Sequence, residues 1–234
     1  MDVIELLPRL HLLRFPVGQA YLWRDDDALT LIDAGTIGAG RVIADAVTAL
    51  GYTPGDVRRI VLTHFHEDHV GGAGEFAALS GAEVLAHDLD APFIRGERPG
   101  PPARFEDWEL PIHAAAVKLL PEGTPVPPAS VTAVSDGDVL DLGGGARVVH
   151  VPGHTDGSIA LFLPAHRVLF TGDTVAASLT DGTVIPGVFN LDRRQLLASL
   201  GRLAELDADV ACFGHGDAVV GGAAAELRKV ASAR

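Results

Sequence analysis

The segment THFHEDHVGG, residues 63–72, places four possible metal ligands in one short stretch: His64, His66, Asp68 and His69. It follows RRIVLT, which is typical of a buried strand, and precedes an apolar pattern typical of a helix over 73–80. Imidazole and carboxylate groups are the ligands that borderline divalent cations such as zinc prefer. Because alternate residues at a strand end point to the same side, His64 and His66 can hold one ion while Asp68 and His69 turn toward a second.

Three further candidate ligands stand just after expected strands, and each follows a glycine. They are His154 in VPGHT, Asp173 in FTGD and His215 in CFGH. Glycine lets the backbone turn sharply and approach a site closely, as loops that gather ligands at one sheet edge require. The agreement between the first segment and these three loops predicts a metal centre.

The pattern HxHxDH, then GHT, GD and GH, resembles that of the metallo-β-lactamase superfamily over essentially the whole chain. The resemblance implies an α+β fold, a four-layer αββα sandwich of two mixed sheets with helices outside and the metals at one edge. It implies that one ion is held by His64, His66 and His154, the other by Asp68, His69 and His215, and that Asp173 bridges them. It also implies that Asp33, in LIDAG, sits behind the ligands and orients them through hydrogen bonds.

A metal-dependent hydrolase is the activity that this resemblance implies. Two cations, most simply two zinc ions per chain with iron or manganese left open, would lower the pKa of a bridging water so that it attacks as hydroxide. Asp68 would align that hydroxide and carry its proton to the leaving group, which makes Asp68 the expected catalytic residue. The expected substrate is a small molecule with an ester, thioester or lactone-type bond.

Other activities within the same superfamily stay open. A mononuclear iron sulfur dioxygenase is the main alternative, because the same ligand types suit iron, and metal content with oxygen uptake would separate it from a hydrolase. Glyoxalase II is disfavoured because it carries a helical domain after its catalytic half, whereas few residues follow His215 here. A secreted β-lactamase is disfavoured because no export signal is visible. The tyrosine that lactonases of this superfamily place after the bridging Asp is not found after Asp173.

The chain is expected to form a single domain over 1–234, with a Pro-rich insertion at about 96–130 that forms a lid or a dimer contact, or is simply a surface loop. Strands are expected at HLLRF, AYLWRD and ALTLIDAG, over 83–87, and through 131–173. Helices are expected over about 40–50, 73–80, 113–120, 193–206 and 222–231.

The charge and composition of the chain limit the classes of binding partner that we expect. A formal net charge of −13 opposes binding to a phosphate backbone, so nucleic acid is not expected as a substrate. No apolar run is long enough for a membrane span, and no secretory leader is visible, which predicts a cytoplasmic protein without a membrane partner. The single cysteine, Cys212, excludes an internal disulfide. A homodimer stays open.

The remaining histidines, at positions 11, 87, 113, 150 and 166, lack ligand spacing and are interpreted as structural. Among them His113 lies in the insertion and could face a substrate, but it is left out of the site. Large aromatic side chains are more often core than ligand contacts. Phe65, between two expected ligands, is the best aromatic candidate for lining a pocket, ahead of Trp23, Trp108 and Phe189.

Overall fold

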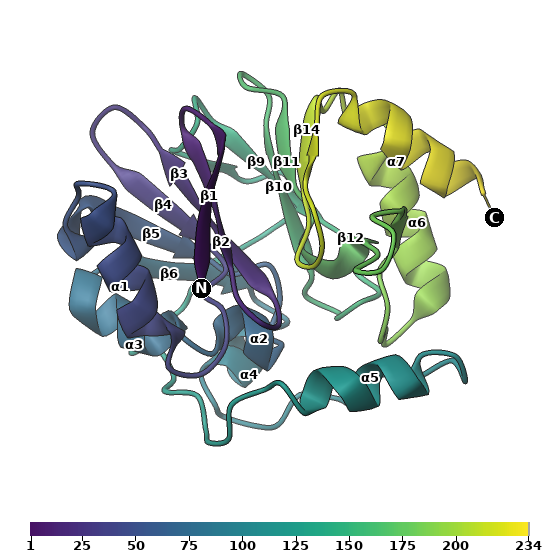
Figure 1. The fold of residues 1–234 in the computed structure, drawn as a ribbon, viewed down its shortest axis with the longest axis horizontal. Coiled ribbons are helices and arrows are strands. Elements are labelled where there is room, and N and C mark those ends of the chain that lie inside the picture. Colours follow the sequence, from purple (N-terminus) through teal and green to yellow (C-terminus); the bar gives the residue numbers. More distant parts are fainter. Residues whose placement is uncertain (234) are drawn as a thin grey trace. The chain divides into compact units, whose positions relative to one another are not determined.

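The computed structural model describes residues 1–233, and Figure 1 traces their backbone. These residues divide into two compact units. The first unit holds residues 1–100 and 114–133, and the second holds residues 101–113 and the chain from 134 onward. The single domain expected over 1–234 stays a prediction. Within residues 1–233, every helix is too short or too polar to span a bilayer.

The sheet of the first unit follows the order of its strands along the chain. Strands β1 to β4 pair antiparallel, and β4, β5 and β6 pair parallel, so the sheet is mixed. The strands are β1 (Asp2–Leu7), β2 (Leu10–Arg14), β3 (Gln19–Arg24), β4 (Leu29–Ile32), β5 (Val57–Val61), β6 (Glu83–His87) and β7 (Thr132–Val134).

Helices cover this sheet because their apolar side chains recur at helical spacing. Ile43 and Val47 of α1 and Phe76 of α3 are buried in one core with Leu31 and Ile60 of the sheet. The helices are α1 (Ala39–Ala49), α2 (Glu67–Val70), α3 (Ala73–Ser80) and α4 (Ala91–Ile94), with a 3₁₀ turn η1 (Pro54–Asp56). The helices expected over 40–50 and 73–80 are confirmed, and so is the strand over 83–87.

The sheet of the second unit has the order β15-β14-β11-β10-β9-β8. Its strands are β8 (Val139–Leu140), β9 (Ala146–His150), β10 (Ile159–Leu163), β11 (Val168–Phe170), β14 (Val210–Cys212) and β15 (Val219–Val220). Only β11 and β14 pair parallel, whereas the other neighbours pair antiparallel. A separate hairpin joins β12 (Val175–Ala177) to β13 (Val184–Pro186). This second sheet is therefore also mixed.

Two long helices pack against each other and against this sheet. Leu200 and Leu203 of α6 (Arg193–Leu203) and Leu227 of α7 (Ala223–Ser232) share a core with Leu169 and Ala211 of the sheet. Helix α6 begins where the side chain of Asp192 accepts a hydrogen bond from the Gln195 amide at 3.0 Å. Two mixed sheets with helices confirm the predicted α+β class.

The Pro-rich stretch at 96–130 contains helix α5 (Leu110–Val117), which begins three residues earlier than expected. Pro111 occupies its first turn, where the missing amide hydrogen costs no hydrogen bond, so the helix extends back to Leu110. No residue of α5 is buried, although its side chains are mostly apolar.

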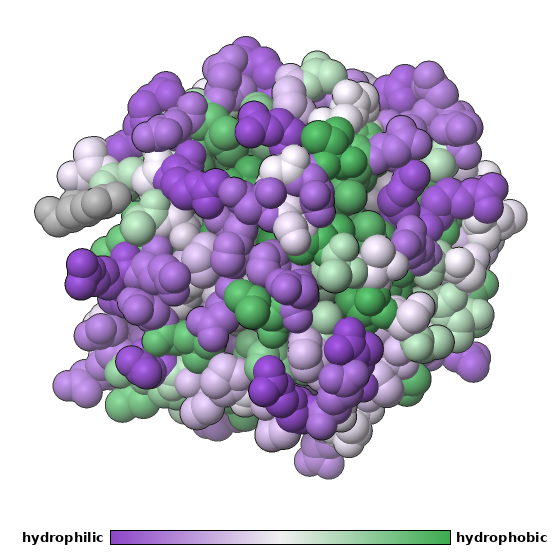
Figure 2. All heavy atoms as spheres, turned by 180° about the vertical axis from the view of Figure 1, so that it is seen from behind, coloured by the Kyte–Doolittle hydropathy of each residue, from purple (hydrophilic) through white to green (hydrophobic). Residues whose placement is uncertain are grey.

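The face drawn in Figure 2 is largely hydrophilic, with small hydrophobic patches between the polar side chains.

Candidate metal centre

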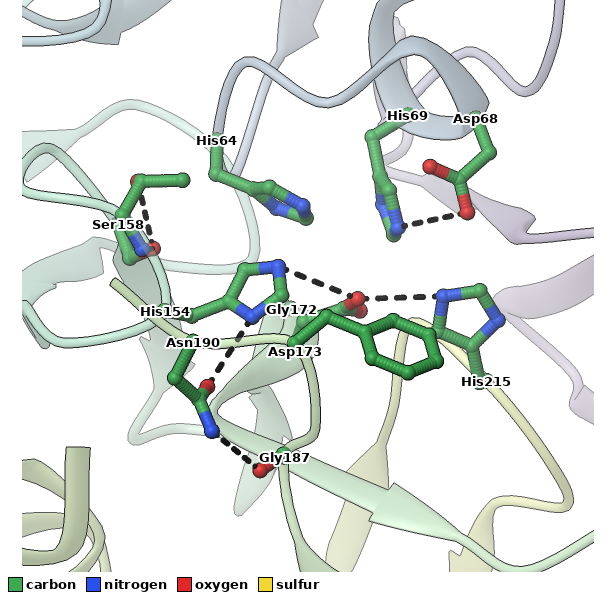
Figure 3. Close-up of polar contacts among 12 residues, drawn as sticks. His64, Asp68, His69, His154, Ser158, Gly172, Asp173, Gly187, Asn190 and His215 are labelled. Atoms are coloured by element: carbon green, nitrogen blue, oxygen red, sulfur yellow. Dashed lines mark hydrogen bonds and ion pairs between the residues drawn. The ribbon is translucent and has the colours of Figure 1, made fainter. Parts of the chain in front are cut away.

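Four of the predicted ligands lie together in the first unit, at the end of strand β5. His66 directly precedes helix α2, and Asp68 and His69 lie on that short helix. The ring centroids of His64 and His69 are 4.1 Å apart, and those of His64 and His66 are 4.8 Å apart. Oδ2 of Asp68 lies 3.6 Å from Nε2 of His69 (Figure 3). His64 and His69 are buried, and Asp68 keeps limited access to solvent.

Asp33 lies behind these ligands at the end of strand β4. Its carboxylate accepts hydrogen bonds from the Thr63 amide at 2.7 Å and the Thr63 hydroxyl at 2.9 Å, and it lies 2.9 Å from Nδ1 of His69. A carboxylate accepts, so Nδ1 of His69 is the donor in this contact, and Nε2 is the ring nitrogen left to bind a cation. The hydrogen bond from a ring to Asp33 that the resemblance implies is therefore present.

The Thr63 hydroxyl fixes a second ring in the same way. Its proton goes to Asp33, so the oxygen accepts from Nδ1 of His64 at 3.0 Å. Nε2 of His64 is then the ring nitrogen left to bind a cation. Asp90, which is fully buried, accepts from the Phe65 amide at 3.1 Å and holds the loop between the two strand-end ligands.

The other three predicted ligands lie together in the second unit. Asp173 Oδ2 lies 3.5 Å from Nε2 of His154 and 3.1 Å from Nε2 of His215, as the dashed lines in Figure 3 mark. Nδ1 of His154 lies 3.2 Å from Oδ1 of Asn190, whose amide nitrogen donates to the Gly187 carbonyl at 2.8 Å. That second bond orients the Asn190 amide, so Nδ1 of His154 is the protonated nitrogen.

The parallel pairing of β11 and β14 explains why Asp173 and His215 meet. Phe170 is paired with Cys212, and each ligand comes three residues after its strand's paired residue. The ends of neighbouring parallel strands lie at one edge of a sheet, so both side chains emerge there. Gly187 permits this arrangement because a side chain at that position would collide with the Asp173 carbonyl.

The donor set suits a divalent cation. In the three buried histidines, His64, His69 and His154, Nδ1 is held by a hydrogen-bond partner, which leaves Nε2 as the ring nitrogen that can bind a cation. Neutral imidazoles oriented in this way, together with carboxylates, are the ligands of zinc and similar metals. The residues therefore fit a metal centre.

The chain's cysteine does not belong to this chemistry. Cys212 lies in strand β14 and is 1% exposed. Burial raises the pKa of its thiol, so the thiolate that attacks a substrate does not form.

The histidines interpreted as structural have other partners: Nδ1 of His87 lies 2.9 Å from Asp88, and Nε2 of His150 lies 2.8 Å from the Asp156 carbonyl. His113 contacts Phe105 and Phe189.

Sequence reasoning missed the residues that hold the ligands, apart from Asp33. Thr63 stands directly before the first ligand, which is a local signal that could have been used. Asn190 is separated from His154 by 36 residues, and no motif joins the two. Buried polar partners of this kind are found from the structure, because their spacing along the chain is arbitrary.

A family model of the metallo-beta-lactamase superfamily matches residues 13–215 of the chain. The chain belongs to the metallo-β-lactamase superfamily. A solved metallo-beta-lactamase family protein from Thermus thermophilus is 31% identical, with a TM-score of 0.68, and the match covers 97% of this chain and 78% of that one. This superfamily member therefore has the metallo-β-lactamase fold.

Curated relatives extend the comparison to activity. The probable metallo-hydrolase YqjP of Bacillus subtilis (strain 168) is 29% identical over 88% of this chain and 69% of its own length. A hydroxyacylglutathione hydrolase of Cereibacter sphaeroides is 29% identical over 82% of this chain and 62% of its own. The acyl-coenzyme A thioesterase MBLAC2 of Gallus gallus is 33% identical over 62% of this chain and 50% of its own length. The chain is a metal-dependent hydrolase of this superfamily.

Proposed function

We propose that the chain is a dinuclear zinc hydrolase that cleaves a thioester or ester bond of a small molecule. The observation that carries the proposal is the shared arrangement of His64, His69 and His154, each held at Nδ1 so that Nε2 is the ring nitrogen left to bind a metal. Histidines that bind a metal almost always have such a hydrogen-bond partner on the other ring nitrogen. In two of the three, His69 and His154, Nε2 also lies within 3.6 Å of a carboxylate oxygen, as the donors of one metal site would.

The proposal assigns the ligands as the resemblance implies. His64, His66 and His154 would hold one ion, Asp68, His69 and His215 would hold the other, and Asp173 would be shared between them. Membership of the superfamily supports this assignment. The contacts of Asp173 with two histidine Nε2 atoms also support a shared position for its carboxylate.

When bound, two zinc ions supply a hydroxide nucleophile near neutral pH and polarise the substrate carbonyl. Asp68 performs the proton transfers. Its carboxylate lies beside Nε2 of His69 and is partly open to solvent, so it can accept a proton from water and pass it to the leaving thiol or alcohol. Asp33 and Asn190 keep the rings of His69 and His154 in the tautomer that leaves Nε2 unprotonated.

Thioesters lead the substrate classes because two relatives carry names of thioester hydrolases, the hydroxyacylglutathione hydrolase and the acyl-coenzyme A thioesterase. The test is a panel of acyl thioesters, esters and lactones, with the released thiol or acid measured before and after chelation. We expect thioester turnover that chelation removes and about two equivalents of zinc restore. Full turnover by the metal-stripped protein would contradict the proposal.

Replacing Asp33 by asparagine is expected to weaken zinc binding about 10-fold to 100-fold, the usual cost of losing a partner behind a metal ligand. An amide cannot accept all three hydrogen bonds that the Asp33 carboxylate shares with Thr63 and His69. Zinc affinity is measured by competition with a chromophoric chelator. Asp27→Asn, at an exposed position, is the control, and equal affinity in the two variants would refute the role of Asp33.

A further inference from the structure

Glu109 is a buried carboxylate that the metal centre does not use directly. It is 1% exposed and lies just before α5, in the part of the Pro-rich segment that belongs to the second unit. Its two oxygens accept from two backbone amides: Oε2 from Glu106 at 2.9 Å and Oε1 from Phe189 at 3.1 Å. A buried carboxylate without such donors would be costly, so these contacts define where the side chain must lie.

Phe189 stands next to Asn190, the residue whose side chain holds His154. Its backbone has a φ of 59°, which a residue with a side chain adopts rarely. Such a conformation persists when the surroundings hold it in place. Two aromatic contacts add to the hydrogen bond from Glu109, because the Phe189 ring lies 5.8 Å from Phe105 and 5.3 Å from His113, centroid to centroid.

The same segment also holds Asn190 itself. The Arg104 amide donates to the Asn190 carbonyl at 2.8 Å, so residues 104–113 bind both members of the Phe189–Asn190 pair. The Asn190 side chain in turn lies against Nδ1 of His154 and donates to the Gly187 carbonyl. Glu109 is therefore connected to the imidazole of His154 through its hydrogen bond to Phe189, the Phe189–Asn190 backbone, and the contact of the Asn190 side chain with Nδ1.

We propose that Glu109 is a positioning residue for the metal centre, which it serves by fixing the Phe189–Asn190 turn and through it the ring of His154. The inference rests on the proposed function, because it needs His154 to bind a metal. It gives the Pro-rich segment a role beyond that of a surface loop: the segment stabilises the arrangement that presents Nε2 of His154 to the cation.

The test compares zinc affinity in the parent, Glu109→Ala and Glu109→Gln, measured by chelator competition on the full chain. Glu109→Ala is expected to lose about 10-fold to 100-fold in affinity, as for other partners behind metal ligands. Glu109→Gln keeps an oxygen that can accept from the Phe189 amide, so this variant is expected to keep most of the zinc affinity of the parent. Glu106→Ala removes an exposed carboxylate from the same segment and keeps its backbone amide, so it controls for charge.

A double-mutant cycle with Asn190→Ala separates positioning from general stabilisation. If Glu109 acts through Asn190, adding Glu109→Ala to Asn190→Ala is expected to cost little further affinity. Additive losses would overturn the proposal, and so would a lower melting temperature of the metal-free Glu109→Ala protein with unchanged zinc affinity. Failure of the proposed function is distinguishable, because the parent itself would then bind no zinc.

Discussion

Replacing Asp173 by alanine is expected to abolish turnover. Zinc affinity is expected to fall by more than the 10-fold to 100-fold that follows from losing a residue hydrogen-bonded to a metal ligand. The carboxylate is 9% exposed and lies within 3.5 Å of Nε2 of both His154 and His215. Removing it takes away the one group that the proposed mechanism shares between both ions. The two histidines would also lose the negative charge that lies between them.

Asp156→Ala is the matched control for this variant. Asp156 is exposed, lies two residues after His154, and contacts His150 through a backbone carbonyl that the substitution keeps. Circular dichroism and zinc titration on both variants separate loss of metal from loss of fold. An Asp173→Ala protein that binds two zinc ions with parental affinity would contradict the bridging role.

Replacing Asp68 by alanine is expected to lower turnover by about 10²-fold to 10⁴-fold, the usual contribution of a positioned acid or base. The fold is expected to persist, because the Asp68 side chain is partly exposed and does not belong to the main core of the first unit. The turnover number, metal content and melting temperature are measured together.

Glu67→Ala provides the comparison for Asp68→Ala, since the two acids are neighbours on the same helix. Burial, and secondly the charge of Asp68, raises the pKa of Glu67 above its ordinary value. Glu67 is given no role in the proton transfers, so its variant is expected to retain most of the turnover. Full turnover in Asp68→Ala would refute the mechanism, whatever Glu67→Ala shows.

The sequence predicts the long helices α1 and α3 because their signals are local, whereas the four-residue helices α2 and α4 were not expected. Apolar spacing defines α3 (Ala73–Ser80) to the residue, and the short motifs around His64 and His154 indicate candidate ligands without knowledge of the fold. Strand β1 (Asp2–Leu7) was not expected, because its side chains are mostly exposed or half-buried and show little alternation. The segment forms a strand because its backbone pairs antiparallel with β2.

The residues that hold the ligands have no such local signal. Asp33 could be predicted only through the resemblance, since 36 residues separate it from His69. Glu109 and Phe189 are 80 residues apart, in a segment whose prolines indicate only an irregular loop. The conformation of such a loop depends on tertiary hydrogen bonds, so the sequence pattern indicates that a segment is present but not what it stabilises.

The most direct test of the central claim is the metal content per chain of protein purified without added metal, with oxygen uptake followed on the same sample. The proposal predicts about two zinc ions per chain and thioester hydrolysis without oxygen consumption. One iron per chain with oxygen uptake would contradict it and favour the dioxygenase. Absence of bound metal together with full hydrolytic turnover would contradict any metal-dependent mechanism.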